Sequence, residues 1–300
     1  MVRDFPHWLL NVRHPAELFN AQPSYVVSQA FCIVGGLLSL AHALHRGGRW
    51  PFLWMASALT GVLVEGSMYF SPHGETIWFS PTVIDLFHQR VPLFIFFVYP
   101  FFYYQAFWAA SKLQLKCRWS EHIAAGLLVV LADLPFDMVS IKFLHWTLHD
   151  TERLLSERVY SAPWTLLLFF AVASFAFSYL FHNLRSWMDR SVGSPQPTDR
   201  RWAVGTIRAE LVAMVGAASA SLSVGTGLFL AFSYPLHTVL GIPHRIIVIG
   251  VFLCVVTVFW KFDRKSNRRM PMRTDYDFHC ISKPPNVGAY WYTVCGTPYE

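Results

Sequence analysis

Charged side chains are scarce in this chain. Asp, Glu, Lys and Arg together make up 14% of its 300 residues, whereas an ordinary soluble domain contains about 25%. Apolar residues take their place, with 54% of the sequence in the apolar set and 17% aromatic. Such a composition excludes a disordered tail, a nucleic-acid-binding module and a typical cytosolic enzyme, because its surface could not be kept in water. It indicates a polytopic membrane protein.

Several motifs are also missing. The chain has no Asn-x-Ser/Thr sequon, no glycine-rich phosphate loop and no internal repeat. The missing phosphate loop argues against a nucleotide-driven pump, and no pattern indicates a bound cofactor. The cysteines do not form a disulfide framework, because they divide between apolar runs and the predicted cytosolic side, where thiols stay reduced. They are Cys32, Cys117, Cys254, Cys280 and Cys295.

Seven apolar runs are long enough to cross a hydrocarbon core of about 30 Å. The expected fold class is therefore all-α, a polytopic membrane protein with seven transmembrane helices. The chain divides into an N-terminal interfacial segment (1–23), a membrane domain (24–261) and a basic cytosolic tail (262–300). The runs are 24–45, 50–71, 91–111, 120–141, 162–183, 209–233 and 244–261.

The basic residues predict the orientation of the chain. Of the 24 Lys and Arg residues, 17 fall on one set of alternating connections. Because basic loops stay in the cytosol, the N-terminus should face the exterior or a lumen, and the C-terminus the cytosol. The net charge of +6 then reflects topology and attraction to membrane lipids, with no nucleic-acid partner. Nothing in the sequence selects between the endoplasmic reticulum and the plasma membrane.

Three acidic residues lie well inside the apolar runs. They are Glu65 in the second run, and Asp133 and Asp137 in the fourth. An ionisable group in hydrocarbon costs several kcal/mol, so such groups face the bundle interior and find partners. The two aspartates are four residues apart and share a helix face, so we expect one of them to be protonated or paired with a cation. The helical rise places all three in the outer half of the membrane.

Further polar side chains are expected at the same level. Asp85, His88 and Arg90 precede the third run, while His145 and His149 continue the stripe of the two aspartates if that helix persists. We therefore predict a polar pocket that leans toward the outer leaflet. Its substrate-binding residues would be His145, Trp146 and Tyr234. The two histidines have a spacing that fits a metal, but a solvated pair is the favoured interpretation, and no metal site is predicted.

Two other runs contrast in volume. Residues 216–227 are almost all small, which allows close helix packing or the approach of a flat ligand. Residues 94–104 are dominated by Phe and Tyr. A small-residue wall opposite an aromatic wall would suit a long apolar ligand, but helix packing alone also explains the small residues.

Loose motifs over about residues 60–170 resemble the integral-membrane carotenoid hydratase family. The resemblance implies a carboxylic acid that protonates an isoprenoid double bond, followed by attack of water on the cation. The chain also looks like uncharacterised animal membrane proteins of unknown function. The motifs that carry the first resemblance are Glu65-Gly66, Val91-Pro92-Leu93, Asp133 with Asp137, Trp146 and Pro163-Trp164.

The expected function is to bind or act on a lipophilic molecule, isoprenoid-like or lipid, at the acidic pocket. In an enzymatic version, one aspartate is the general acid and the other stabilises positive charge. Glu65 and His88 would relay protons, and Arg90 would fix their ionisation. The alternatives are a proton- or cation-coupled transporter, in which the same acids bind the ion, and a structural subunit, in which they only hold helices together.

Overall fold

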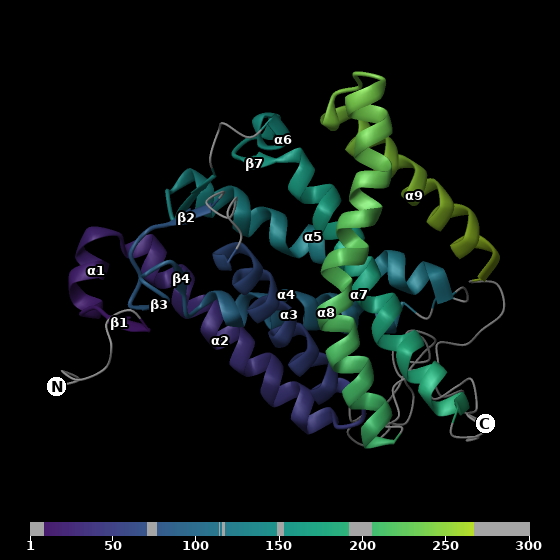
Figure 1. Ribbon diagram of the computed structural model, residues 1–300, viewed down its shortest axis with the longest axis horizontal. Helices are drawn as coiled ribbons and strands as arrows, with labels where there is room; N and C mark the ends of the chain where they lie inside the picture. Colours follow the sequence, from purple (N-terminus) through teal and green to yellow (C-terminus); the bar gives the residue numbers. More distant parts are fainter. Residues whose placement is uncertain are drawn as a thin grey trace, which may run out of the picture.

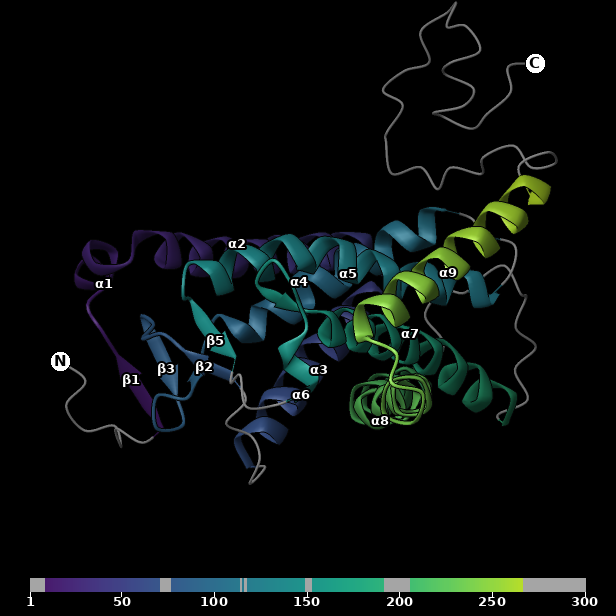
Figure 2. The same cartoon turned by 90° about the horizontal axis from the view of Figure 1, so that it is seen from above.

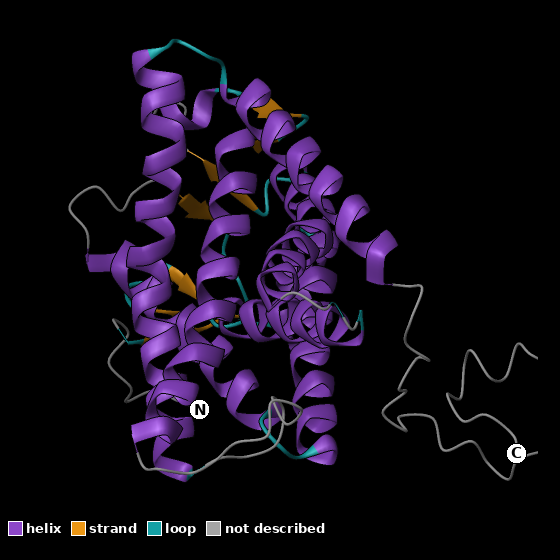
Figure 3. Ribbon diagram, turned by 90° about the vertical axis from the view of Figure 1, so that its right-hand side faces the viewer, coloured by secondary structure: helices purple, strands orange, loops and turns teal. Residues whose placement is uncertain are grey.

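The computed structural model describes residues 9–70, 77–113, 115, 118–148, 153–191 and 206–266. Helices dominate this part of the chain (Figure 3), which confirms the all-α class. The helices are α1 (Pro15–Ala21), α2 (Pro23–Arg46), α3 (Trp50–Phe70), α4 (Ile95–Lys112), α5 (Arg118–Lys142), α6 (Arg153–Ser156), α7 (Trp164–Ser191), α8 (Ile207–Ser233), the π-helix η1 (Tyr234–Val239) and α9 (His244–Ser266).

Local sequence explains several helix boundaries. Pro15 and Pro23 stand in the first turns of α1 and α2, where a missing N–H costs nothing. Gly47, with a φ of +64°, ends α2, because only glycine adopts this conformation without strain. Thr206 precedes α8, and its hydroxyl accepts a hydrogen bond from the backbone N–H of Ala209 at 3.3 Å, as an N-cap residue does.

Short antiparallel strands bring distant connections to one end of the helices. Strand β3 pairs with both β1 and β4, β2 pairs with β5, and β6 pairs with β7. The N-terminal segment, the α3–α4 connection and the α5–α7 connection therefore meet on the side of the molecule where α1 lies (Figures 1 and 2). The strands are β1 (Leu10–Val12), β2 (Ile77–Phe79), β3 (Ile84–Leu86), β4 (Val91–Pro92), β5 (Trp146–Leu148), β6 (Arg158–Val159) and β7 (Ala162–Pro163).

Within the described residues, five helices are long and apolar enough to cross a membrane. Helices α2 and α9 expose many large apolar side chains, as lipid-facing helices do. Helices α3 and α4 are not in this set. Several membrane-like helices are thus confirmed, while seven crossings stay a prediction. The five segments are Pro23–Arg46, Trp119–Lys142, Trp164–Met188, Ile207–Val239 and His244–Lys261.

Helix α4 packs tightly against α2 because two glycines of α2 leave room for its rings. A Cβ atom at Gly35 would lie 2.4 Å from Phe101, and one at Gly36 would lie 2.9 Å from Phe97. Both distances are shorter than a van der Waals contact, so α4 could not approach this closely if α2 carried side chains here. This contact fixes the position of α4 and of the pocket residues that it carries.

The small-residue run of α8 packs along α7, so helix packing accounts for it. A Cβ atom at Gly216 would lie 2.5 Å from Leu184, and one at Gly225 would lie 2.7 Å from the Cα atom of Ala173. The rings of α4 pack instead against α2, α3, α5 and α7. The small-residue wall therefore does not need a flat ligand to explain it.

Some sequence predictions concern segments of which little is described. Residues 10–12 form a strand and Pro15–Ala21 a helix, so the described part of the N-terminal segment is only partly helical. His149, Cys117, Cys280, Cys295 and nearly all of the predicted tail 262–300 lie outside the described residues.

Candidate functional site

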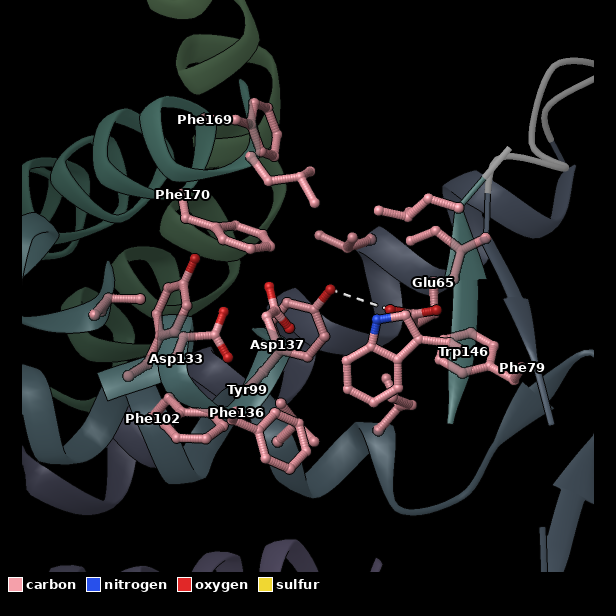
Figure 4. A pocket seen from close by; sticks show the side chains of 18 residues that line it. Glu65, Phe79, Tyr99, Phe102, Asp133, Phe136, Asp137, Trp146, Phe169 and Phe170 are labelled. Atoms are coloured by element: carbon pink, nitrogen blue, oxygen red, sulfur yellow. Dashed lines mark hydrogen bonds between the residues drawn. The ribbon is translucent and has the colours of Figure 1, made fainter. Parts of the chain in front are cut away.

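Three acidic side chains meet in one cavity of about 140 Å³. Glu65 comes from α3, and Asp133 and Asp137 come from successive turns of α5. The carboxylates of the two aspartates point into the cavity (Figure 4). We call this cavity the acidic pocket. The structure thus brings together the three acids that the sequence singled out, and their chemical roles stay predictions.

The other walls of the acidic pocket are mainly aromatic and aliphatic. Phe102 and Phe136 lie on one side of the aspartate carboxylates and Phe170 on the other (Figure 4). Helices α3, α4, α5 and α7 and strands β2 and β5 supply the lining. It consists of Val64, Glu65, Ile77, Phe79, Ile95, Val98, Tyr99, Phe102, Tyr103, Val129, Asp133, Phe136, Asp137, Trp146, Leu148, Leu166, Phe169 and Phe170.

Of the three carboxylates, Glu65 alone has a hydrogen-bond donor among the described residues. The hydroxyl of Tyr99 donates to its Oε1 atom at 3.1 Å. No hydrogen bond or ion pair with a described residue reaches the side chains of Asp133 and Asp137, and the lining contains no Lys, Arg or His. A carboxylate in apolar surroundings needs a proton, a donor or a cation to offset its desolvation. The two aspartates can therefore accept a donor or a cation from a ligand.

The position of Tyr99 depends on a glycine in α3. A Cβ atom at Gly61 would lie 2.7 Å from the ring of Tyr99, so this ring fits only because residue 61 has no side chain. Gly61 precedes Glu65 by four residues, which is about one helical turn. The side chain of Tyr99 passes α3 at Gly61, and its hydroxyl therefore reaches the carboxylate of Glu65.

The position at which α5 ends determines which of the residues that follow it line the acidic pocket. The sequence placed His145 on the stripe of the aspartates only if this helix continued beyond its expected end at residue 141, and it does not. The helix ends at Lys142, Leu144 adopts a left-handed φ of 58°, and strand β5 begins at Trp146. The change of direction places Trp146 in the lining, opposite Phe79 of β2, and leaves His145 out of it.

His145 instead holds the start of α2 against the end of α5. Its Nε2 atom lies 3.2 Å from the hydroxyl oxygen of Ser24, and its Nδ1 atom lies 3.3 Å from that of Ser140. Its ring stacks on Tyr25, with 4.7 Å between the ring centroids. The side chain is 1% exposed, and this burial lowers the pKa of His145 below its ordinary value of about 6.5. We therefore assign His145 to packing of the helix ends.

We expect acid to weaken the fold through His145. Its pKa is lower in the folded chain, so the unfolded chain takes up the proton first as the pH falls through about 6.5. Stability should be constant above that pH and should fall below it, by at most about 1.4 kcal/mol per pH unit. His145→Asn should reduce this slope, as measured by thermal unfolding between pH 5 and 8. The exposed His45→Asn serves as the control, and an equal slope in both variants would contradict the assignment.

The remaining predicted site residues lie away from the acidic pocket. His88 and Arg90 are exposed in the turn between β3 and β4, and Tyr234, at the start of η1, is 60% exposed. Asp85 is buried in β3 and forms an ion pair with Arg13. The turn between β3 and β4 carries the two basic side chains away from the acids, so a proton relay through His88 and Arg90 loses its geometric support.

Sequence reasoning missed a second buried group of charges. Glu210 of α8 is fully buried between two guanidinium groups: its Oε2 atom lies 2.7 Å from Nε of Arg49, and its Oε1 atom lies 3.3 Å from Nε of Arg185. Arg49 also donates to the backbone oxygen of Phe181 at 2.8 Å and lies 3.1 Å from Nδ1 of His182. We call these residues the Arg–Glu cluster. One signal was available, because Glu210 falls within the apolar run 209–233.

Residues 1–275 match the family described as Domain of unknown function (DUF7802), and the chain belongs to this family. No curated protein and no solved structure matches the chain. The resemblance to uncharacterised membrane proteins is thus consistent with the family, whereas no match supports the resemblance to carotenoid hydratases.

Proposed function

We propose that the acidic pocket binds the cationic end of a lipophilic molecule, such as a long-chain amine, within the membrane. The observation that supports this proposal is a cavity lined by three carboxylates and many rings, in which Asp133 and Asp137 have no partner among the described residues. An ammonium group would supply the missing charge. It would also interact favourably with the faces of the surrounding rings.

The size of the cavity restricts which part of the ligand it can hold. Pockets for whole drug-sized ligands measure about 300–1,000 Å³, whereas the acidic pocket measures about 140 Å³. A cavity of this size accepts a ring-sized fragment. The proposal therefore places a head group in the pocket and the apolar remainder of the molecule outside it. A polyene enclosed along its whole length would not fit.

We further propose that α3 and α4 also cross the membrane, which gives seven crossings. With 21 and 18 residues, they would span about 32 and 27 Å, close to the thickness of the hydrocarbon core. The strand pairs support the alternation of sides, because they join the N-terminal segment to the α3–α4 and α5–α7 connections at one end. The excess of basic residues on the other connections then orients that end toward the exterior or a lumen.

A binding experiment tests the function directly. The purified protein in phosphatidylcholine nanodiscs is offered hexadecylamine or its neutral analogue hexadecanol, and native mass spectrometry measures the bound fraction. We expect the amine to be retained about 10- to 100-fold more strongly, since a charge-assisted hydrogen bond contributes about 1.5–3 kcal/mol. The double variant Asp133→Asn with Asp137→Asn should lose this preference, because it removes charge at nearly constant volume.

Glu17→Gln is the matched control, because Glu17 is exposed on α1 and should leave the preference unchanged. Equal retention of amine and alcohol, or an unchanged preference in the double variant, would contradict the proposal.

The transporter alternative has a separate test in proteoliposomes. If wild-type protein dissipates a proton or sodium gradient and the double variant does not, the carboxylates carry an ion. A change in the mass of the bound ligand would instead indicate catalysis.

A further inference from the structure

We propose that Glu157, His237 and His244 form a binding site for a divalent transition metal, with Zn²⁺ as the best fit. The three side chains come from separate segments: Glu157 follows α6, His237 belongs to η1, and His244 is the first residue of α9. One potential ligand atom of each lies within 4.8 Å of those of the other two. In Figure 1, α6 lies beside the connection between α8 and α9, where these segments meet.

A buried nitrogen without a hydrogen bond points to a missing ligand. His244 is 0% exposed, and its Nδ1 atom has no hydrogen-bond partner. The same atom lies 3.8 Å from Oε1 of Glu157, which is too long for a hydrogen bond. Buried polar atoms in proteins are nearly always satisfied. A metal ion between this nitrogen and the carboxylate would satisfy both.

Second contacts of the two histidines leave one nitrogen of each ring for a metal. Nε2 of His244 lies 2.9 Å from the hydroxyl oxygen of Ser233, and Nδ1 of His237 lies 3.0 Å from the backbone oxygen of Ile242. That carbonyl can only accept, so Nδ1 of His237 carries the proton and Nε2 keeps its lone pair. If Nε2 of His244 donates to the Ser233 hydroxyl in the same way, Nδ1 of His244 also keeps its lone pair. Metal-bound histidines typically donate their other N–H to such an acceptor.

The ligand set indicates which metal the site would prefer. Two imidazoles and one carboxylate suit Zn²⁺, which binds nitrogen at about 2.0–2.1 Å and carboxylate oxygen at about 2.0–2.2 Å. Calcium and magnesium prefer ligand sets composed of oxygen atoms. Three protein ligands also leave a fourth tetrahedral position for water or a further ligand. The site is separate from the acidic pocket, since none of its residues lines that cavity.

Glu157 also has a structural role that is compatible with metal binding. Its Oε1 and Oε2 atoms accept hydrogen bonds from the backbone N–H groups of His244 and Arg245, at 3.2 and 3.3 Å. The carboxylate thereby caps the start of α9. Each carboxylate oxygen accepts more than one interaction, so the cap leaves capacity for a metal. The cap positions Glu157 beside the two imidazoles.

Metal titration of the full-length protein tests the site. Protein in detergent is stripped with a chelator and titrated with Zn²⁺, and bound metal is quantified by elemental mass spectrometry. We expect one tightly bound Zn²⁺ per chain. The affinity of His237→Ala for Zn²⁺ should be at least about 100-fold lower than that of the wild-type protein. Ser233→Ala keeps all three ligands and should lower the affinity by about 10- to 100-fold. Co²⁺ should give the visible absorption of a tetrahedral nitrogen and oxygen site, which a purely structural histidine pair would not produce.

His45→Ala is the matched control, because this exposed histidine is not part of the cluster and should bind metal as wild type does. His237 is only partly buried, so its replacement is the variant of choice, and circular dichroism confirms its folding. Absence of tight binding in the wild-type protein would overturn the proposal. Equal affinities of His237→Ala and His45→Ala would overturn it as well. Neither result would affect the amine-binding test, which depends on different residues.

Discussion

Replacement of Glu210 by Ala should lower the free energy of unfolding by about 3–5 kcal/mol, which is the usual loss when one partner of a buried ion pair is removed. Arg49 is 1% exposed, Arg185 is 4% exposed at the side chain, and Glu210 is fully buried. Without the carboxylate, two positive charges would stay close together in the interior of the protein. Unfolding by SDS in mixed micelles, followed by circular dichroism, measures the loss.

Two further variants separate the charge from the packing. Glu17→Ala removes an exposed acid and should change stability by less than about 0.5 kcal/mol. Replacement of Glu210, Arg49 and Arg185 together by Met or Leu removes all three charges and should recover most of the loss, since apolar residues often replace a buried ionic group without cost. A loss below about 1 kcal/mol in Glu210→Ala would show that the Arg–Glu cluster does not hold α8 in place.

The second large effect is expected at Gly225 of α8, where substitution by Ala should destabilise the protein by about 1–3 kcal/mol. The new methyl group would lie 2.7 Å from the Cα atom of Ala173. That atom belongs to the backbone of α7, so the contact is relieved only if the two helices separate. The same SDS titration measures the effect.

Gly227 provides an internal control in the same helix. Apart from the backbone of its own helix, no described atom lies within 4 Å of a Cβ built at this position, so Gly227→Ala should be neutral or slightly stabilising through helix propensity. The two variants make the same chemical change two residues apart. Equal free energies of unfolding for Gly225→Ala and Gly227→Ala would contradict the close packing of α8 on α7 at Gly225.

The sequence predicted the helices and the central acids for a simple physical reason. Apolar segments in a membrane must satisfy their backbone groups internally, which makes them helices. Acids such as Glu65, Asp133 and Asp137 must avoid lipid, which directs them toward one another and toward the bundle interior. The four-residue spacing of the aspartates already placed both on one face. These inferences need no knowledge of how the helices are arranged.

Details that depend on a single backbone angle or on distant pairs could not be predicted. His145 would have continued the stripe of the aspartates only if α5 had continued beyond its expected end, and the left-handed Leu144 turns the chain there. The Arg–Glu cluster joins residues 161 positions apart. Glu157, His237 and His244 come from three segments with one ligand atom each, so no spacing motif reveals them. Only the arrangement of the helices brings such residues together.

The Arg–Glu cluster also imposes an order on biogenesis. The ion pair between Arg49 and Glu210 cannot form until 161 further residues have been made, which takes about 8–32 s at usual rates of synthesis. Helix α3 is therefore made long before α8 can dock against it. A nascent chain that stops before α8 therefore lacks this contact. The buried cluster thus becomes possible only once α8 has been made, while α9 still follows.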